Sequence, residues 1–337
     1  MNTENRQIRL AARPSGLPTD VWQVTTEAVP EPADGTFVVA LSHLSLDPAM
    51  RGWMDDRPSY LPPVGLGEVM RAGGAGRVVA SRHHRFAEGD HVTGMFGVQE
   101  FAMSDGRGVR RVDTGVAGLP TYLGTLGMTG LTAYFGLFDV CAMRAGETVL
   151  VSGAAGAVGS VVGQLAKIKG GTAVGIAGGP QKCAWLTDEL GFDAAVDYRG
   201  EEKLGRALRA ACPDGVDVYF DNVGGEILDA ALARLRRGAR VAICGAISQY
   251  NAQGRPAGPA NYLSLLVNRA RMEGFLVFDY AERFPEAVAE LAGWLAEGKL
   301  ISREQVVTGD ITAFPETFLT LFRGGNTGKL VLQIAEA

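Results

Sequence analysis

Two patterns of hydrophobic and polar residues divide the chain. Up to about Asp113, short apolar runs are repeatedly interrupted by glycine, proline and polar turn residues, which is typical of β strands. The clearest runs cover 36–41, 76–80 and 91–95. Because such short strands joined by tight turns are more typical of antiparallel than of parallel sheets, this part predicts a compact, mostly antiparallel β domain.

After Gly118, segments with the helical period alternate with short runs rich in valine and isoleucine. This alternation indicates βαβ units in a doubly wound parallel sheet, so the chain is predicted to be an α/β protein. The expected elements are strands at 148–152, 172–177, 216–221, 239–244 and 273–278, and helices at 158–169, 181–190 and 226–236. From about Ile311 the pattern predicts a helix and a final strand at 328–333, which is expected to return to the first domain.

Length and composition are those of a globular protein with about two domains. The chain has 337 residues, of which 47% are hydrophobic and 20% charged, and this balance argues against disorder. A net charge of -5 without a long block of one sign argues against a nucleic-acid surface or a membrane anchor, so a small-molecule partner is expected. The first twenty residues lack the apolar core of a signal peptide, and no apolar stretch is long enough to span a membrane. A cytoplasmic location is therefore expected.

The cysteines and histidines lack the spacing of metal ligands or of a redox pair, so no protein-bound metal is expected. These residues are Cys141, Cys183, Cys212, Cys244, His43, His83, His84 and His91. Cys244 ends an apolar strand with no activating base nearby in the sequence, and we interpret it as a small hydrophobic residue. The arginines at 234, 236, 237 and 240 are interpreted as the cationic end of a helix that stops before Gly238.

Glycine is about twice as frequent as usual, with 46 residues, and nine of the 29 residues from Val151 to Gly179 are glycine. The first of them follow an apolar strand as Gly153-Ala154-Ala155-Gly156-Ala157-Val158-Gly159. Small residues are needed where the backbone turns sharply, approaches a pyrophosphate and opens a helix, as in dinucleotide-binding domains. A glycine-rich turn without a ligand is the alternative, but the strand before the turn and the helix after it favour a dinucleotide.

The end of the next strand indicates which dinucleotide is bound. An acidic residue there would bind the ribose 2′-hydroxyl of NAD, but Ala177-Gly178-Gly179-Pro180 is followed by no acid until Asp188. Lys182 is placed to pair with a 2′-phosphate, so NADP is favoured over NAD. A solvated lysine near the start of a helix is the alternative.

Several motifs along the chain match one family. They are Leu46-Asp47-Pro48-Ala49-Met50-Arg51, Leu126-Gly127-Met128-Thr129-Gly130-Leu131-Thr132-Ala133-Tyr134, the glycine turn continuing as Ser160-Val161-Val162-Gly163-Gln164-Leu165-Ala166-Lys167, Phe220-Asp221-Asn222-Val223-Gly224-Gly225, Cys244-Gly245-Ala246-Ile247-Ser248-Gln249-Tyr250-Asn251, Arg271-Met272-Glu273-Gly274-Phe275 and Asn326-Thr327-Gly328-Lys329. With these motifs the chain resembles the zinc-free medium-chain dehydrogenase/reductases. It is most similar to their prostaglandin and leukotriene reductase branch, with its alkenal-reductase and bacterial curcumin-reductase-like relatives.

The resemblance implies two domains and a cofactor site. A GroES-like, mostly-β catalytic domain would cover 1–125 and be completed by 311–337, and a Rossmann NADP-binding domain would cover 126–310. It also implies a homodimer, joined through the last Rossmann strand near 273–278. The residues that the resemblance assigns to NADP are Pro48, Met128, Thr129, Gly156, Ala157, Val158, Gly159, Gly178, Lys182, Tyr198, Asn222, Cys244, Gly245, Ala246, Ile247, Ser248, Tyr250, Phe275, Leu276, Val277 and Asn326. Among them, 156–159 would hold the pyrophosphate, and Lys182 and Tyr198 would contact the side that carries the 2′-phosphate.

Two zinc motifs of the wider superfamily are missing, because Gly67-Glu68 lacks the intervening histidine and no four close cysteines occur. Zinc-dependent alcohol oxidation is therefore not expected. The simplest remaining chemistry is hydride delivery to an activated C=C bond, with the adjacent carbonyl taking up the charge as an enolate.

An enolate needs hydrogen-bond donors and a proton for its α-carbon, which tyrosine hydroxyls or the nicotinamide ribose can supply. The candidates are Tyr60, in a proline-flanked loop, and Tyr250, which follows the strand that carries Cys244. Ordinary packing tyrosines are the alternative for both. Some relatives carry a tyrosine shortly before the Arg-Met-Glu segment, but this chain has Val267 there, so no catalytic role is transferred to that position.

The leading hypothesis is an NADPH-dependent reductase of α,β-unsaturated ketones or aldehydes. A quinone reductase would share the same cofactor site and differ mainly in the shape of its pocket. An NADPH-binding sensor or structural protein with little turnover is the alternative from a different class. One sequence determines neither the physiological substrate nor the group that protonates the α-carbon.

Overall fold

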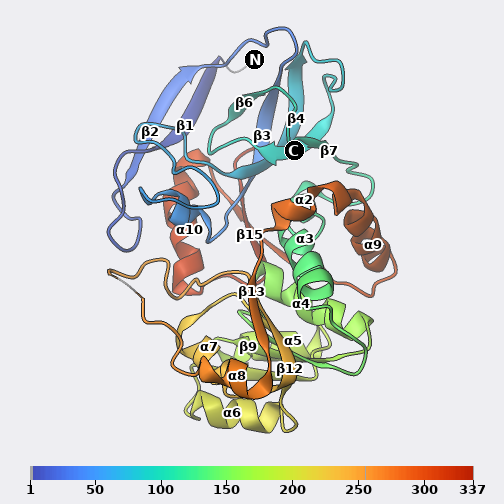
Figure 1. The fold of residues 1–337 in the computed structure, drawn as a ribbon. Helices are drawn as coiled ribbons and strands as arrows, with labels where there is room; N and C mark the ends of the chain where they lie inside the picture. The colour runs from blue at the N-terminus through green and yellow to red at the C-terminus, as the bar shows by residue number, and fades with distance from the viewer. Residues whose placement is uncertain (1–2, 255, 337) are drawn as a thin grey trace. The chain divides into compact units, whose positions relative to one another are not determined.

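A computed structural model describes residues 3–254 and 256–336, which form two compact units. The first contains the chain up to Leu123 and from Glu304 onward, and the second is Gly124–Arg303. Figure 1 shows the first unit's N-terminal strands in blue to cyan and its returning tail in red. The chain was expected to return to the first domain at residue 311. It returns earlier, at Glu304, because strand β14 (Glu304–Thr308) pairs with β15 (Lys329–Gln333) in the first unit's sheet.

The first unit is mostly β, as predicted. Its main sheet has seven strands in the order β14-β15-β3-β4-β5-β7, with β6 paired to β3, and β1 and β2 form a separate hairpin. Every pair is antiparallel except β14 with β15. The strands not yet placed are β1 (Glu4–Leu10), β2 (Trp22–Ala28), β3 (Phe37–Ser45), β4 (Gly73–Ser81), β5 (His91–Met95), β6 (Phe101–Ser104) and β7 (Arg110–Arg111). The three predicted runs correspond to β3, β4 and β5.

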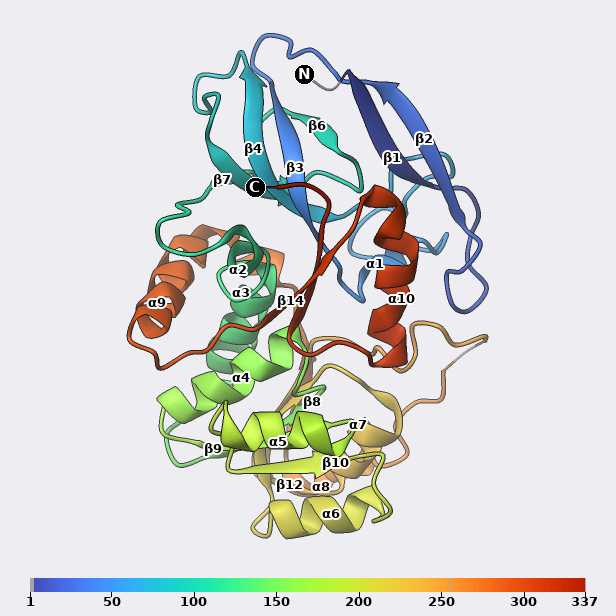
Figure 2. The same ribbon diagram turned by 180° about the vertical axis from the view of Figure 1, so that it is seen from behind.

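The tail of the chain forms the predicted helix and strand. Helix α10 (Phe314–Arg323) is drawn in red in Figure 2. It packs two buried phenylalanines against Trp22, whose ring centroid lies 5.3 Å from that of Phe314 and 6.3 Å from that of Phe318. Strand β15 then pairs antiparallel with β3, placing Val331 opposite Ser45. The other helices of this unit are α1 (Met50–Trp53), α2 (Leu119–Leu123) and the short 3₁₀ helix η3 (Ile311–Ala313).

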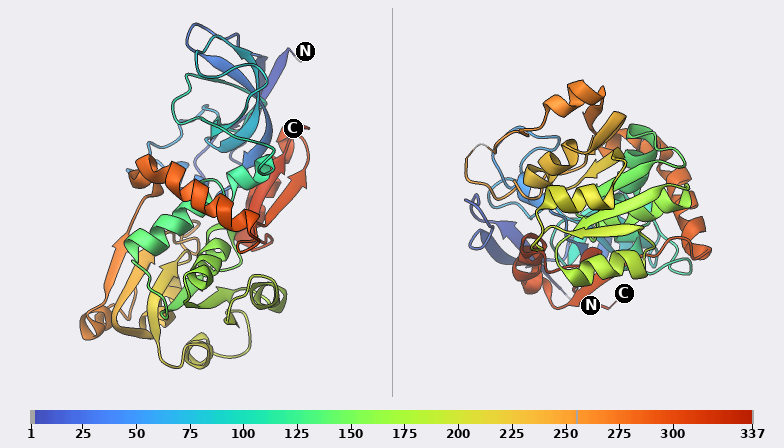
Figure 3. Two further views of the ribbon diagram at one scale, coloured as in Figure 1. Left: turned by 90° about the vertical axis from the view of Figure 1, so that its right-hand side faces the viewer. Right: turned by 90° about the horizontal axis from the view of Figure 1, so that it is seen from below.

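The second unit is built on a six-stranded parallel sheet in the order β10-β9-β8-β11-β12-β13. Counted along the chain this is the strand order 3-2-1-4-5-6 of a Rossmann domain, as predicted. Helices lie on both faces of the sheet (Figure 3). The strands are β8 (Thr148–Ser152), β9 (Thr172–Ala177), β10 (Ala194–Asp197), β11 (Val216–Asp221), β12 (Leu235–Ile243) and β13 (Arg271–Gly274). The helices are α3 (Met128–Phe135), η1 (Gly136–Val140), α4 (Ala157–Ile168), α5 (Pro180–Asp188), α6 (Leu204–Ala211), α7 (Gly225–Leu232), α8 (Leu263–Asn268), η2 (Val277–Arg283) and α9 (Phe284–Ala296).

Three expectations for the second unit were wrong in detail. The predicted helix 226–236 ends at Leu232, and β12 already begins at Leu235, so the arginines at 236 and 237 lie on a strand and not at a helix end. Gly238 allows β12 to begin before this point, because the glycine lies where the pairing of β12 with β11 shifts register and has the φ of +78° that such a bulge requires. The last strand stops at Gly274, and β10 was not expected.

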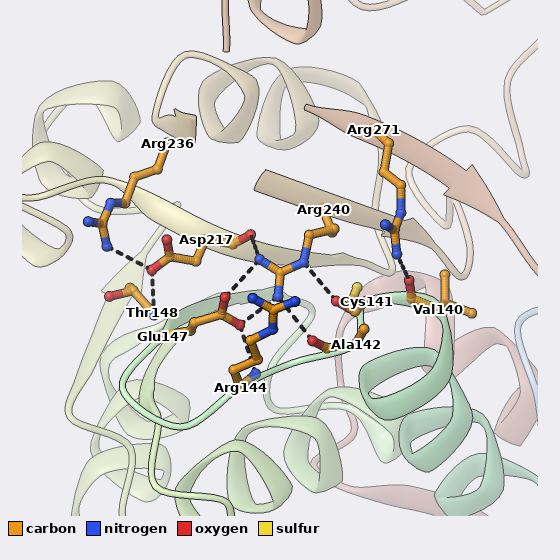
Figure 4. A network of polar contacts seen from close by, with 10 residues as sticks. All are labelled: Val140, Cys141, Ala142, Arg144, Glu147, Thr148, Asp217, Arg236, Arg240 and Arg271. Atoms are coloured by element: carbon orange, nitrogen blue, oxygen red, sulfur yellow. Dashed lines mark hydrogen bonds and ion pairs between the residues drawn. The ribbon is translucent and has the colours of Figure 1, made fainter. Parts of the chain in front are cut away.

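Arg240 of β12 ties the sheet to the segment that leads into β8 (Figure 4). Its guanidinium donates to the carbonyl oxygen of Cys141 at 2.8 Å and pairs with both carboxylate oxygens of Glu147 at 2.5 and 2.9 Å. Burial opposes the ionisation of Glu147, but the hydrogen bonds and charges of Arg240 and Arg144 together outweigh it and lower the pKa of this carboxyl. Nearby, Asp217 accepts the N–H of Thr148 and pairs with Arg236, both at 3.0 Å. The amino ends of β8 and β11 are therefore held by side-chain ion pairs.

Within the described ranges, no helix combines the length and the apolar character needed to cross a membrane.

Candidate active site

The turn after β8 is tight, so that its backbone segments pack closely against each other, and it leads directly into helix α4. Gly153 has a φ of +57°, and Gly156 is the N-cap of α4, which begins at Ala157. A Cβ on Gly159 would lie 2.4 Å from the carbonyl oxygen of Gly153, so the turn requires glycine there. No side chain of the described residues caps α4 at Gly156. The N–H groups of a first helical turn need acceptors from outside the helix, and a pyrophosphate is a suitable one.

The glycine turn lies beside the point at which the strand order reverses, between β8 and β11. A Cβ on Gly153 would lie 3.4 Å from the Cβ of Asn222. Asn222 is fixed there, because its side-chain amide donates to the carbonyl oxygen of Ser152 at 2.7 Å and its N–H to the Ser152 hydroxyl at 2.9 Å. Doubly wound sheets bind their ligands at such a switch point. The structure thus brings the predicted residues 156–159 and Asn222 to one place.

A buried carboxylate that was not among the predicted site residues organises this edge. Asp221 ends β11 and is only 1% exposed. Its Oδ1 accepts four hydrogen bonds of 2.7 to 3.1 Å, from the hydroxyls of Ser152 and Tyr219 and the N–H groups of Val223 and Gly224. Such bonds compensate a buried charge and lock the turn that carries Asn222. An acidic residue at the end of an apolar strand was the sequence signal for this role.

Glycine keeps a space open in the turn after β9. A Cβ on Gly178 would lie 2.9 Å from the ring of Tyr198 and 3.1 Å from Nε of Arg199. Arg199 lies over the Tyr198 ring, 5.4 Å from its centroid, and donates to its hydroxyl at 3.2 Å. Gly179, with a φ of +96°, donates its N–H to Asp197 at 2.8 Å. The acid that ends β10 is thus bonded to the backbone of this turn.

Lys182, in the first turn of α5, lies within electrostatic reach of Arg199. Burial, and after it repulsion by Arg199, lowers the pKa of Lys182 below its usual 10.5. Two neighbouring cations beside a tyrosine hydroxyl form a suitable site for a phosphate. Arg199 was missed in the sequence because β10, which ends two residues before it, was not recognised.

Cys244 directly follows β12, and its N–H donates to the carbonyl oxygen of Asp221 at 2.9 Å. Burial, reinforced by the charge of Asp221, raises the pKa of the Cys244 thiol to about 12. A thiol with this pKa is not a nucleophile at neutral pH. Its environment is that of the small hydrophobic residue expected from the sequence.

The segment 246–250 folds back over the turn after β11. The Ser248 hydroxyl donates to the carbonyl oxygen of Val223 at 2.6 Å. The Tyr250 hydroxyl accepts the N–H of Ala246 at 3.2 Å, so this phenol supports its own turn. The segment therefore forms a compact wall next to Asn222.

The remaining candidates of the second unit lie at the start of α3 and at the end of β13. Met128 is exposed, whereas Thr129 is buried and donates its hydroxyl to the carbonyl oxygen of Gly124 at 2.9 Å. Phe275 packs edge-to-face on Phe220, with centroids 6.1 Å apart. The chain then passes from half-buried Leu276 to buried Val277, where η2 begins.

Pro48, Asn326 and Tyr60 belong to the first unit. Pro48 follows Asp47, whose carboxylate pairs at 2.5 Å with the buried ammonium of Lys329. Asn326 donates its amide to the carbonyl oxygen two residues further on, at 3.1 Å. Tyr60 is 45% exposed and accepts a hydrogen bond from the indole N–H of Trp53 at 3.0 Å. Lys329 was not predicted to be a structural residue, although a single lysine within an apolar strand is the sequence signal for a buried, paired ammonium.

Within residues 3–254 and 256–336, no three His, Cys, Asp or Glu side chains come together as a potential metal site.

Comparison with known proteins agrees with the class that the fold defines. Residues 6–112 match a family described as "N-terminal domain of oxidoreductase", and residues 157–293 match one described as "Zinc-binding dehydrogenase". The chain belongs to the medium-chain dehydrogenase/reductase superfamily, in the branch of the prostaglandin, curcumin and alkenal reductases.

Three relatives illustrate this branch. A putative NADP-dependent oxidoreductase of Bacillus subtilis is 46% identical over 100% of this chain and 99% of its own length. The NADPH-dependent curcumin reductase of Escherichia coli is 40% identical, over 98% of this chain and 97% of its own. The crystal structure of CurA from Vibrio vulnificus in complex with NADPH is 42% identical, with a TM-score of 0.92 over 98% of this chain and 100% of that one.

Proposed function

We propose that this protein is an NADPH-dependent oxidoreductase that reduces the C=C bond of α,β-unsaturated ketones and aldehydes. The main supporting observation is the glycine-lined turn after β9, with Lys182, Tyr198 and Arg199 around it. It occurs in a chain that is 40% identical, over nearly its full length, to an NADPH-dependent curcumin reductase. The residues that would ligate a catalytic zinc in the wider superfamily are missing at Gly67-Glu68, so the proposed reaction is independent of zinc.

The residues of the second unit fit NADPH at two points. At Gly159 a Cβ would collide with the backbone, as expected where a helix N-terminus must approach a pyrophosphate. At Gly178 a side chain would fill the space in front of Arg199, which the adenosine 2′-phosphate would occupy. Lys182 and Arg199 would supply its counter-charges and Tyr198 a hydroxyl donor.

Bound NADPH would supply a hydride to the β-carbon of the substrate, and the electron pair of the C=C bond would move onto the carbonyl oxygen as an enolate. The protein's task is then to stabilise this oxygen and to keep the substrate in position. We propose that Tyr60 donates its hydroxyl hydrogen bond to the developing enolate. The α-carbon finally takes up one proton, which completes the reduction.

Tyr250 is the second candidate donor. Its oxygen accepts the N–H of Ala246, so a hydrogen bond donated to a substrate would be made with the phenolic proton. We propose that Tyr250 mainly shapes the wall 244–250, and that Tyr60 contributes more to turnover. The residues 244–248, with Phe275, Leu276 and Val277, would line the rest of the cofactor, as would Pro48, Met128, Thr129 and Asn326.

The proposed function is tested by following NADPH oxidation with a graded panel of enones, enals and quinones, with NADH as the matched cofactor. We expect turnover with small enones and a strong preference for NADPH. Turnover of quinones alone would replace the proposal by a quinone reductase. Tight binding of NADPH without oxidation by any member of the panel would overturn the enzyme proposal in favour of a sensor or structural protein.

We propose in addition that two copies pair through β13 in a homodimer in the cytoplasm. β13 lies at the end of the sheet order, and all four of its residues are exposed. In an antiparallel pair centred on Met272, Arg271 of one copy would face Glu273 of the other, so the strand complements itself in charge. Sedimentation would give the mass of a dimer, and a Met272→Pro variant, which cannot complete the strand pairing, would sediment as a monomer.

A further inference from the structure

The loop that carries Tyr60 is closed at its base by backbone hydrogen bonds. The N–H of Val64 donates to the carbonyl oxygen of Trp53 at 2.8 Å, and this bond joins the two ends of the loop 54–64. Arg13 reinforces the closure, because its guanidinium donates to the carbonyl oxygens of Met54 and Val64 at 2.7 and 2.5 Å. The loop is therefore fixed to the first unit at both ends.

Trp53 itself is held firmly beneath this loop. Its side chain is only 8% exposed, and the guanidinium of Arg71 lies 5.7 Å from the centre of its ring. Arg71 also donates to the carbonyl oxygen of Pro62 at 2.9 Å, which ties the far part of the loop to the same indole. Trp53 ends α1, which follows the Asp47-Pro48 motif anchored by Lys329.

The direction of the hydrogen bond between Trp53 and Tyr60 follows from chemistry alone. An indole nitrogen only donates, so the Tyr60 oxygen, 3.0 Å away, must accept. The proton of the phenol then points away from the indole. A phenol oxygen that accepts a hydrogen bond is also a stronger donor through its own proton, because the two bonds polarise each other.

We propose that Trp53 is a positioning residue that holds the Tyr60 hydroxyl as a hydrogen-bond donor to the substrate carbonyl. This inference rests on the proposed function, in which Tyr60 stabilises the enolate. This role requires no contact of Trp53 with substrate or cofactor and no proton transfer to or from its indole. It fixes the orientation of the phenol before the substrate arrives, which reduces the ordering needed in the transition state.

Trp53→Phe keeps an aromatic ring beneath the loop and removes only the indole donor. We expect kcat for an enone to fall about tenfold while the KM for NADPH is unchanged, since one neutral hydrogen bond is lost away from the cofactor. In a Tyr60→Phe background the same substitution should have no further effect, because the phenol oxygen is already absent. Equal losses of kcat in both backgrounds would overturn the proposal.

Trp22→Phe is the matched control. The Trp22 indole also donates one hydrogen bond, to the carbonyl oxygen of Pro18 at 3.0 Å, and its ring packs in the core of the same unit. This variant should lose a similar amount of stability but keep kcat. A comparable fall in kcat for Trp22→Phe would show that the Trp53 effect is merely structural.

A readout independent of activity is the indole N–H resonance of Trp53 in an NMR spectrum, assigned in the wild-type protein through its connectivity to the backbone of Trp53. In Tyr60→Phe this resonance should move upfield while that of Trp22 stays in place. An unchanged resonance would overturn the proposed contact, even if Trp53→Phe failed to fold. A protein without enone turnover would instead refute the proposed function, and the resonance would still decide whether Trp53 orients Tyr60.

Discussion

The two ends of the strands in the six-stranded sheet differ in structure: side chains fill the space at the amino ends, and backbone turns lie at the carboxyl ends. At the edge where β8 and β11 begin, Arg240, Glu147, Asp217 and Arg236 fill the space with ion pairs. At the edge where these strands end, glycines leave space, and the buried Asp221 is bonded to the neighbouring turns. One edge is closed by side chains, whereas the other presents backbone.

The difference reflects what each edge must contact. An edge that has to accommodate a dinucleotide needs turns without Cβ atoms and backbone N–H groups directed outward. An edge without a ligand can be covered by long side chains that fasten the preceding helices to the sheet. Substitutions at the two edges should therefore separate binding from stability.

The largest effect is expected at the glycine turn. Gly159→Ala would place a Cβ 2.4 Å from the Gly153 carbonyl oxygen, so the turn must open and its N–H groups lose their arrangement. We expect NADPH affinity to fall about a hundredfold or more, as measured by fluorescence titration. Gly205→Ala is the control, because a Cβ there meets nothing within 4 Å. Unchanged affinity in Gly159→Ala would show that this turn does not hold the cofactor.

At the opposite edge, Arg240→Met should lower the free energy of unfolding by about 2–4 kcal/mol without changing NADPH affinity, because Glu147 loses its partner. Arg237→Met, on the exposed side of the same strand, is the control. The folded-state pKa of Glu147 is depressed, so its contribution is present above the usual 4.5 and lost as the pH falls through the lower value. The difference in Tm between wild type and Arg240→Met should therefore shrink in acid, and a constant difference would argue against the ion pair.

A smaller effect is expected at the phosphate side of the ligand edge. Lys182→Ala should weaken NADPH binding by about 1.5–3 kcal/mol and leave NADH binding nearly unchanged, because only NADPH carries the 2′-phosphate. Arg199→Ala should act in the same direction. Equal weakening of both cofactors would refute the assignment of this site.

The same site predicts a pH dependence. The pKa of Lys182 is lowered below 10.5, and a phosphate binds the protonated form. NADPH affinity should therefore decline as the pH rises through this lowered pKa, whereas NADH affinity should stay level. Isothermal titration at a series of alkaline pH values would reveal the difference, and it should be smaller in Lys182→Ala.

The regular elements of the parallel sheet were predictable to a large extent. β8, β9 and β11 occupy the expected residues, because buried parallel strands are short apolar runs with turn residues at both ends. β10 was missed, since its residues Ala194 to Asp197 are few and only weakly apolar. The second half of β12 was predicted, but its first residues from Leu235 were assigned to a helix because of their composition. Only the pairing with β11 makes these residues part of the strand.

The candidate site was predictable where it consists of backbone, and less so where it consists of side chains. Gly156, Gly159 and Gly178 could be proposed from the sequence, because the need for small residues is local. Asp221, Arg199 and Trp53 were not, because their importance depends on partners that follow other strands or belong to a different loop.

The amino-acid sequence by itself determined the division into a β part and an α/β part, the dinucleotide turn and the neutral end of β9. These features depend on neighbours along the chain, through periodicity, turn geometry and the presence or absence of a Cβ. Only the tertiary structure decided that Asp221 locks the turn of Asn222, that Arg199 joins Lys182, and that Trp53 orients Tyr60. Hydrogen bonds and charges act across space, so which groups meet is settled by strand order and loop closure.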